Sequence, residues 1–270
     1  MLRFLAACAC VLLAHPAYGI DSAAKPKPPP VPWWRLKASV GYHFSSGDYT
    51  GSDNTVIQYV PLVLTADVDR WRVQGTIPWL YVSGPAGIID GPTGPIESNG
   101  TNDGLGDLLL RGSYLLPLER LLPEDEPVPG WLPYTDLIGL VKFPTASRSD
   151  GLGTGEFDFG LDADLTWMVG RWSPFCSLGY RFLGSPPNQH LYDVITASVG
   201  ALYRLSPSLS GGALLDYRQP PTAQTGQRLE LVPYVSWLFT PPWSLDSYVS
   251  IGLSNGSPDV GFGSQLGYTW

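Results

Sequence analysis

The sequence predicts an all-β fold, a transmembrane antiparallel up-and-down β-barrel of about 12 strands. The first observation is the composition, because 31 Gly, 10 Trp and 14 Tyr stand beside only 15% charged residues. The second is the mean hydropathy of +0.02, far below that of a helical membrane protein with long apolar runs. The third is an alternation of apolar and polar residues from residue 34 onward. Such alternation cancels in the mean and is typical of a barrel with lipid outside and water inside.

The amino-terminal residues have the pattern of a secretory signal peptide. Arg3 gives a positive start, residues 4–14 form an apolar core, and small residues precede a cut after Gly19. The apolar run is shorter than the roughly 20 residues with which a helix crosses a bilayer. The predicted domains are a cleaved signal peptide (1–19), a proline-rich periplasmic linker (20–33) and an outer-membrane barrel (34–270).

The mature chain shows no sequence pattern of a disulfide, metal or cofactor site. Cleavage removes Cys8 and Cys10, so Cys176 alone remains and no internal disulfide is expected. One cysteine indicates neither a metal site nor a redox centre, and no cofactor is predicted. The formal net charge is −8, and it becomes −9 when Arg3 leaves with the signal peptide. This acidic balance argues against nucleic acid as a partner, because nucleic acids select basic surfaces.

About 12 segments carry the strand pattern. In the first segment, Trp34 and Leu36 fall on one face while Arg35 and Lys37 fall on the other. The predicted strands start at residue 34 and continue at 54–66, 70–80, 107–116, 134–144, 156–169, 171–183, 191–203, 208–218, 228–239, 243–253 and 259–270. Two of these segments, 54–66 and 134–144, are apolar on both faces, so the sequence leaves open which face meets lipid.

The links between the segments alternate in length. The short links are 67–69, 170, 205–206 and 240–242, and the long links are 45–53, 83–102, 145–155 and 219–227. Short periplasmic turns and long extracellular loops are typical of outer-membrane barrels. Residues 117–133 are the exception, predicted to be an enlarged periplasmic turn with an acidic tip at 124–126. The tryptophans expected in the interfacial girdles are Trp71, Trp79, Trp172, Trp237 and Trp243.

The clearest strand is predicted at residues 156–169. Its acids, Glu156, Asp158, Asp162 and Asp164, share one face, and apolar side chains fill the other. Four carboxylates on one face cannot fill a dry core, but they can line water. The residues predicted to line the lumen carry both signs and are Arg35, Lys37, Asp107, Arg111, Lys142, Glu156, Asp158, Asp162, Asp164, Arg181, Asp216, Arg218 and Glu230.

Charges of both signs leave two functions open. In a watery lumen the acids would concentrate cations, and the barrel would be a channel for small solutes. If the charges pair, the lumen is closed and the barrel is structural or adhesive. A barrel that hydrolyses lipid would need a histidine beside a serine. Only His43, on the predicted lumen face, and His190, in the polar loop 184–190, remain after cleavage, so no catalytic residue is predicted.

The chain ends inside a predicted strand on an aromatic side chain. Tyr268 and Trp270 resemble the terminal signal read by the outer-membrane assembly machinery, in which Phe is more usual than Trp. We therefore expect two partners, the lipid bilayer and that machinery. The expected location is the outer membrane of a Gram-negative bacterium.

Several glycine-rich phrases of the sequence resemble a known family. The phrases are Asp103-Gly104-Leu105-Gly106-Asp107-Leu108, Leu140-Val141-Lys142-Phe143-Pro144-Thr145, Gly151-Leu152-Gly153-Thr154-Gly155, Leu178-Gly179-Tyr180-Arg181-Phe182 and Ile77-Pro78. They are similar to those of the outer-membrane family named for the MetA pathway of phenol degradation, over about residue 56 to the carboxyl terminus. The resemblance implies a transporter of small, often aromatic or apolar, compounds, and it brings no catalytic residues.

Overall fold

The computed structural model describes residues 34–49, 54–85, 87–123, 129–187 and 189–270. The predicted signal peptide, the proline-rich linker and the acidic tip at 124–126 lie outside these residues. In the described part of the chain no helix is long and apolar enough to cross a membrane, a finding that does not concern strands.

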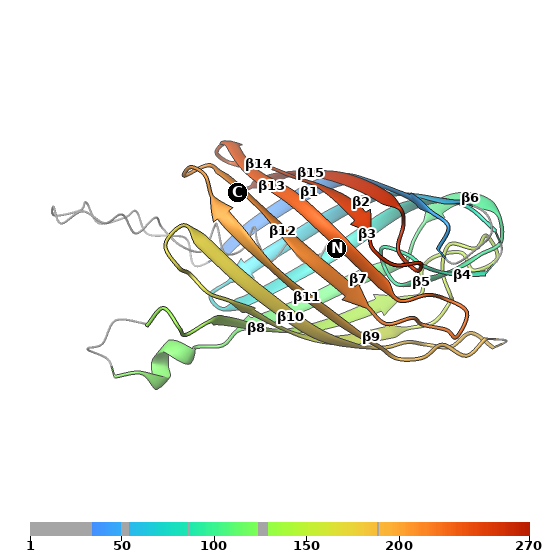
Figure 1. Cartoon of the computed structure of the whole chain (residues 1–270), viewed down its shortest axis with the longest axis horizontal. Coiled ribbons are helices and arrows are strands. Elements are labelled where there is room, and N and C mark those ends of the chain that lie inside the picture. Colours follow the sequence, from blue (N-terminus) through green and yellow to red (C-terminus); the bar gives the residue numbers. More distant parts are fainter. Residues whose placement is uncertain (1–33, 50–53, 86, 124–128, 188) are drawn as a thin grey trace.

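The described strands form a closed antiparallel barrel (Figure 1). Its strands are β1 (Trp34–Gly47), β2 (Thr55–Val68), β3 (Trp71–Ser83), β6 (Thr101–Leu105), β7 (Leu108–Leu115), β8 (Tyr134–Phe143), β9 (Asp158–Thr166), β10 (Trp172–Phe182), β11 (Val194–Arg204), β12 (Leu209–Arg218), β13 (Arg228–Thr240), β14 (Trp243–Gly252) and β15 (Val260–Thr269). Because β1 pairs with both β2 and β15, the first and last strands of the wall are joined and the barrel is closed. Since β6 and β7 both pair with β3 as halves of one interrupted strand, the 13 strands of the sheet make the predicted 12-stranded barrel.

A bulge separates β6 from β7. Trp79 of β3 faces Leu105 and Thr76 faces Leu109, so β7 has one residue more than β3 over this stretch. The extra residue reverses the alternation, and the side chain of Asp107 turns inward and is buried. A Cβ at Gly106 would lie 2.6 Å from a methyl carbon of Leu80, so a larger residue at the bulge would require the Leu80 side chain to shift.

The two faces of the wall differ in polarity as the alternation predicts. On β9, Phe159 and Leu161 are 50% and 63% exposed, whereas Asp158 and Asp162 are buried. Because apolar side chains point outward along the whole circumference, the outer face fits hydrocarbon.

The structure also settles the two strands that are apolar on both faces. In β2, Leu62 and Leu64 point outward, and Tyr59 and Val63 are buried inside. In β8, Leu137 is exposed on the outside and Ile138 is buried.

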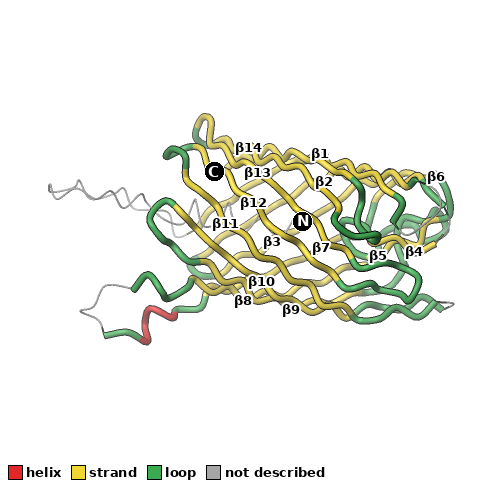
Figure 2. The backbone as a smooth tube through the Cα atoms, in the orientation of Figure 1, coloured by secondary structure: helices red, strands yellow, loops and turns green. Residues whose placement is uncertain are grey.

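The two ends of the barrel differ in their connections (Figure 2). One end carries the short turns, the carboxyl terminus and a 3₁₀ helix, η1 (Leu118–Leu121), in the enlarged turn after β7. Several girdle aromatics pair there, with ring centroids 4.6 Å apart for Trp71 and Tyr114 and 4.8 Å apart for Trp172 and Tyr203. The long loops lie at the other end, which we call the long-loop end.

The long link after β3 is not the plain loop that the sequence predicts. It contains a two-stranded hairpin, β4 (Gly87–Asp90) and β5 (Pro95–Ser98), and then β6, which continues the barrel wall. We call residues 84–85 and 87–100 the mouth hairpin. Its isoleucines are buried, which a solvated loop would not allow.

Candidate functional site

The mouth hairpin crosses the long-loop end of the barrel. It leaves the wall at β3, and the carboxylate of Asp90 at its tip forms ion pairs with Arg218 of β12 and Arg228 of β13. Strands β3 and β12 lie on opposite sides of the ring of strands. The tip turns through Gly91 and Gly94, whose backbone groups exchange hydrogen bonds of 3.0 and 3.4 Å. The hairpin therefore narrows the opening of the barrel.

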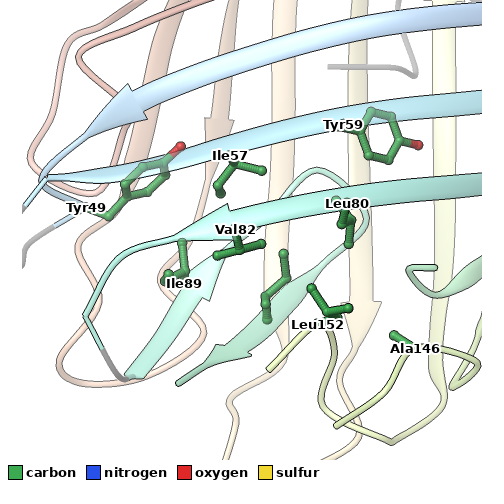
Figure 3. Packing of buried hydrophobic residues seen from close by; sticks show 9 residues of the cluster. Tyr49, Ile57, Tyr59, Leu80, Val82, Ile89, Ala146 and Leu152 are labelled. Atoms are coloured by element: carbon green, nitrogen blue, oxygen red, sulfur yellow. The ribbon is translucent and has the colours of Figure 1, made fainter. Parts of the chain in front are cut away.

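An apolar cluster holds the base of the hairpin against the wall (Figure 3). Its members are buried side chains of β2, β3, the hairpin, the residue Tyr49 just after β1 and the loop at 144–157, namely Tyr49, Ile57, Tyr59, Leu80, Val82, Ile89, Ile96, Ala146 and Leu152. Burial raises the pKa of the Tyr49 hydroxyl to about 12, so this group stays protonated at neutral pH.

Polar contacts fasten the loop at 144–157 to the hairpin. Nε of Arg148 donates to Glu97 at 2.9 Å, and the amide of Asn99 donates to the backbone oxygen of Ser149 at 2.7 Å. Gly151 has a φ of 66°, and a Cβ there would lie 2.7 Å from Oδ1 of Asn99. Gly151 of the glycine-rich phrase thus makes a close-fitting contact with the hairpin.

Lys142 is the centre of a buried ion network behind the hairpin. Its ammonium group lies 2.8 Å from Asp158 and 3.2 Å from Asp107, and it is 3.2 Å from the hydroxyl of Thr154. The side chain of Lys142 is only 1% exposed. One ammonium group thus compensates two carboxylates that come from different parts of the wall.

A second buried ion pair joins β9 to β10. Nη2 of Arg181 donates to both oxygens of Asp162, at 2.7 and 2.6 Å. In the strand register Arg181 faces Gly160 and Asp162 faces Gly179. A Cβ at Gly179 would lie 1.8 Å from Oδ1 of Asp162, and one at Gly160 would lie 2.4 Å from Nη1 of Arg181. The two glycines provide the room for this bidentate pair.

The remaining charges of the predicted lumen set are distributed along the wall. Arg111 lies 3.6 Å from Asp164, and Lys37 lies 3.9 Å from Asp246. Glu230 is fully buried and accepts a hydrogen bond of 2.7 Å from Nε of Arg228. Asp216 and Arg218 line a cavity beside the hairpin tip, and Arg35 is half-buried near the start of β1.

Glu156 is not part of the predicted acidic ladder. The strand begins at Asp158, and Glu156 precedes it in the loop from β8. The strand is shorter than predicted because residues 144–157 pack on the mouth hairpin instead of continuing the wall. Asp158, Asp162 and Asp164 do lie on one strand face, each beside a cation.

The sequence interpretation missed the groups at the hairpin tip. Asp90 stands in a segment expected to be an extracellular loop, and Arg228, its second partner, was not among the predicted lumen residues. The available signal was the pair Ile88 and Ile89 with Ile96, three apolar residues around a Gly-Pro-rich turn.

Two cavities flank the hairpin tip. One is lined by His43, Tyr59, Tyr248 and the charged groups near Arg228. The other is larger and extends along β3 and β7 to β12. His43 and Tyr248 are linked by a hydrogen bond of 2.8 Å between Nδ1 and the phenol oxygen.

No hydrolytic or metal centre is evident in the described residues. Nδ1 of His190 lies 3.5 Å from Oγ of Ser185, but both side chains are exposed in the loop after β10 and no carboxylate orients the imidazole there. The described side chains include no group of three or more metal-binding residues.

The carboxyl-terminal residues complete the barrel. The backbone nitrogen of Trp270 donates to the carbonyl of Leu36 at 2.9 Å, and the rings of Tyr268 and Trp270 lie 5.0 Å apart. The side chain of Trp270 is exposed. Its part in recognition by the assembly machinery stays a prediction.

The closed wall, the apolar outer face and the charged interior define a transmembrane β-barrel of the outer-membrane class. Residues 42–270 match the family described as "Putative MetA-pathway of phenol degradation", and the chain belongs to this family. The resemblance found in the sequence is thereby confirmed. No curated protein sequence matches the chain.

Three solved structures are similar to the chain to different degrees. The COG4313 outer membrane channel from Pseudomonas putida F1 is similar with a TM-score of 0.68 and 15% identity, over 93% of this chain and 100% of that chain. The P. putida toluene transporter TodX has a TM-score of 0.46 and 10% identity, over 87% of this chain and 88% of that chain. The CymD monoaromatic hydrocarbon channel has a TM-score of 0.42 and 12% identity, over 87% of each chain. The first of these likenesses supports the fold.

Proposed function

We propose that the protein is an outer-membrane channel for small solutes, aromatic or apolar ones included. The observation that carries this proposal is the pair of cavities on the two sides of the mouth hairpin, inside a closed transmembrane barrel. A barrel filled completely by side chains would leave no such space. Belonging to a family named for phenol degradation supports small aromatic solutes.

The proposed location is the bacterial outer membrane, reached after cleavage of the signal peptide near Gly19 and assembly of the barrel by the outer-membrane machinery. The short-turn end would then face the periplasm and the long-loop end the cell exterior. The mouth hairpin would guard the external entrance.

Two measurements test the channel function together. Ion conductance of the purified protein in a planar bilayer reports an open watery path. Uptake of a labelled small aromatic compound, by cells with and without the protein, reports a path for neutral solutes that carry no current. If the protein changes neither conductance nor uptake, the channel function is wrong.

A second candidate is a structural or adhesive barrel with a closed lumen. The observation that favours it is the pairing of the lumenal acids, because Asp158, Asp162 and Asp164 each lie beside a cation. Paired charges also remove most of the reason to expect a strong preference for cations. The same two measurements separate this candidate from the channel, since a closed barrel gives neither current nor uptake.

A further inference from the structure

The larger cavity beside the mouth hairpin carries three guanidinium groups. Arg111 of β7, Arg181 of β10 and Arg218 of β12 all line it, although they come from strands that are not neighbours. Arg181 lies close enough to interact electrostatically with both of the other two. Three like charges are thus brought together around one space.

These three groups are compensated unequally. Arg111 lies 3.6 Å from Asp164, farther than the length of a charge-assisted hydrogen bond. Arg181 is held by Asp162, yet its buried Nε has no hydrogen-bond partner. Arg218 is bound by Asp90, a side chain of the hairpin rather than of the wall. Arg111 and Arg218 are therefore the two guanidinium groups that an anion in this cavity can bind, since the groups of Arg181 are already used or buried.

Apolar residues form more than half of the remaining lining, which also contains the carboxylates of Asp90 and Asp158, both of them in ion pairs. Leu109 and Leu140 line it from the wall, and Val194 from the start of β11. Pro92 and Pro95 of the hairpin cover it. An occupant of this space needs an apolar body as well as a group that guanidinium binds.

We infer that this cavity is a binding site for small organic acids with one carboxylate on an aromatic or apolar body. Guanidinium groups bind carboxylates through short charge-assisted hydrogen bonds, and the apolar walls would cover the body of the solute. The inference rests on the proposed function, because it names the solute class of the channel.

The hairpin tip already presents a carboxylate to this site. Asp90 occupies Arg218, so a solute carboxylate that binds Arg218 competes with it. In this exchange the solute carboxylate replaces that of Asp90, so the guanidinium of Arg218 remains paired with an anion. The tip would then keep the weaker contacts of Arg228 with Asp90, 3.9 Å to the carboxylate and 3.4 Å to the backbone oxygen. Binding of the acid and release of the hairpin are therefore coupled.

Calorimetric titration of the purified full-length protein in detergent micelles tests the site. The probes are benzoate and benzyl alcohol, which share a ring but differ in the carboxylate. Benzoate should bind about tenfold more tightly or better, the equivalent of one charge-assisted hydrogen bond. Arg111→Gln should weaken benzoate about tenfold and leave benzyl alcohol unchanged. Asp90→Asn should strengthen benzoate, because the competing carboxylate is gone.

Arg120→Gln is the matched control, since Arg120 is exposed in η1 at the short-turn end. Heat-dependent gel migration verifies that each variant is folded. Equal affinity for the two probes, or unchanged benzoate affinity in Arg111→Gln, would overturn the site. Unchanged or weaker binding in Asp90→Asn would overturn the competition with the hairpin. A protein that conducts or mediates uptake of a neutral aromatic compound but does not bind benzoate refutes this inference alone.

Discussion

The positions of individual glycines follow from the ion pairs that they face. Gly179 lies against Asp162, and a Cβ there would lie 1.8 Å from the carboxylate that holds Arg181. The family phrase Leu178-Gly179-Tyr180-Arg181-Phe182 thus combines a cation with the space for its partner on β9. Alternation predicts that Arg181 and Asp162 point inward. It cannot predict that they meet, because pairing depends on the register between two strands.

Gly179→Ala should destabilise the barrel by about 1–3 kcal/mol, since the methyl group displaces a buried ion pair from its geometry. Gly139→Ala is the matched control, because Gly139 is exposed on the outer face of β8 and nothing lies near its Cβ position. Urea titrations of both variants in lipid vesicles give the free energies of unfolding. Similar losses at the two glycines would show that the ion pair does not depend on this space.

The division between lipid and lumen can be tested at two adjacent residues of β10. Leu178 is 62% exposed on the outer face, whereas the hydroxyl of Ser177 donates to Asp164 at 2.5 Å inside. Leu178→Arg should cost about 2–4 kcal/mol in vesicle folding titrations, because its charge would enter hydrocarbon. Ser177→Arg should cost less, because the new cation lies beside a carboxylate. If both variants lose the same stability, the outer face is not the lipid face. Asp162 is unsuitable as the inner position, since a second arginine there would face Arg181.

At the scale of elements, the strands that could be predicted are those in which apolar and polar residues alternate strictly. The strands from β9 to β15 were predicted within a few residues of their observed bounds, because inner and outer residues alternate without interruption. The β6–β7 strand was only half predicted, since the bulge at Gly106 reverses the alternation. The mouth hairpin was missed because a period of two does not tell whether a loop folds outward or across the lumen.

The ion pairs of Asp90 make a prediction about the hairpin as an element. Asp90→Asn removes the charge that binds the tip to Arg218 and Arg228 across the mouth, so the hairpin should leave the opening more often. Single-channel recordings in planar bilayers should show a higher mean conductance than the unmodified protein. Asp103→Asn is the matched control, since Asp103 is an exposed carboxylate on β6 just after the hairpin. An unchanged conductance in Asp90→Asn, with the same number of inserted channels, would mean that the hairpin does not limit the path.

At the scale of the whole molecule, the spacing of the girdle aromatics fits the thickness of an outer membrane. Trp71 and Trp79 lie on the same outer face of β3. Eight residues of a strand tilted by about 40° rise about 20 Å along the barrel axis, close to the height of an apolar band in an outer membrane. The closed sheet with an even number of strands followed from counting periodic segments. The space left inside it did not, because it depends on how loops fold into the lumen.

The orientation itself makes the last prediction. If the long-loop end faces the exterior, an epitope tag between Ser149 and Asp150 should bind antibody on intact cells, since both side chains lie in the loop after β8 away from the apolar cluster. The mouth hairpin, although long, is a poor tag site, because its tip is buried against Arg218. A tag in the turn at 205–208 between β11 and β12 is the counterpart at the opposite end and should bind antibody only after lysis. Antibody binding at 205–208 on intact cells, with none at 149–150, would reverse the barrel and place the mouth hairpin on the periplasmic side. The hairpin would then control exit of solutes rather than entry, whereas the predicted pattern of labelling leaves it at the external entrance.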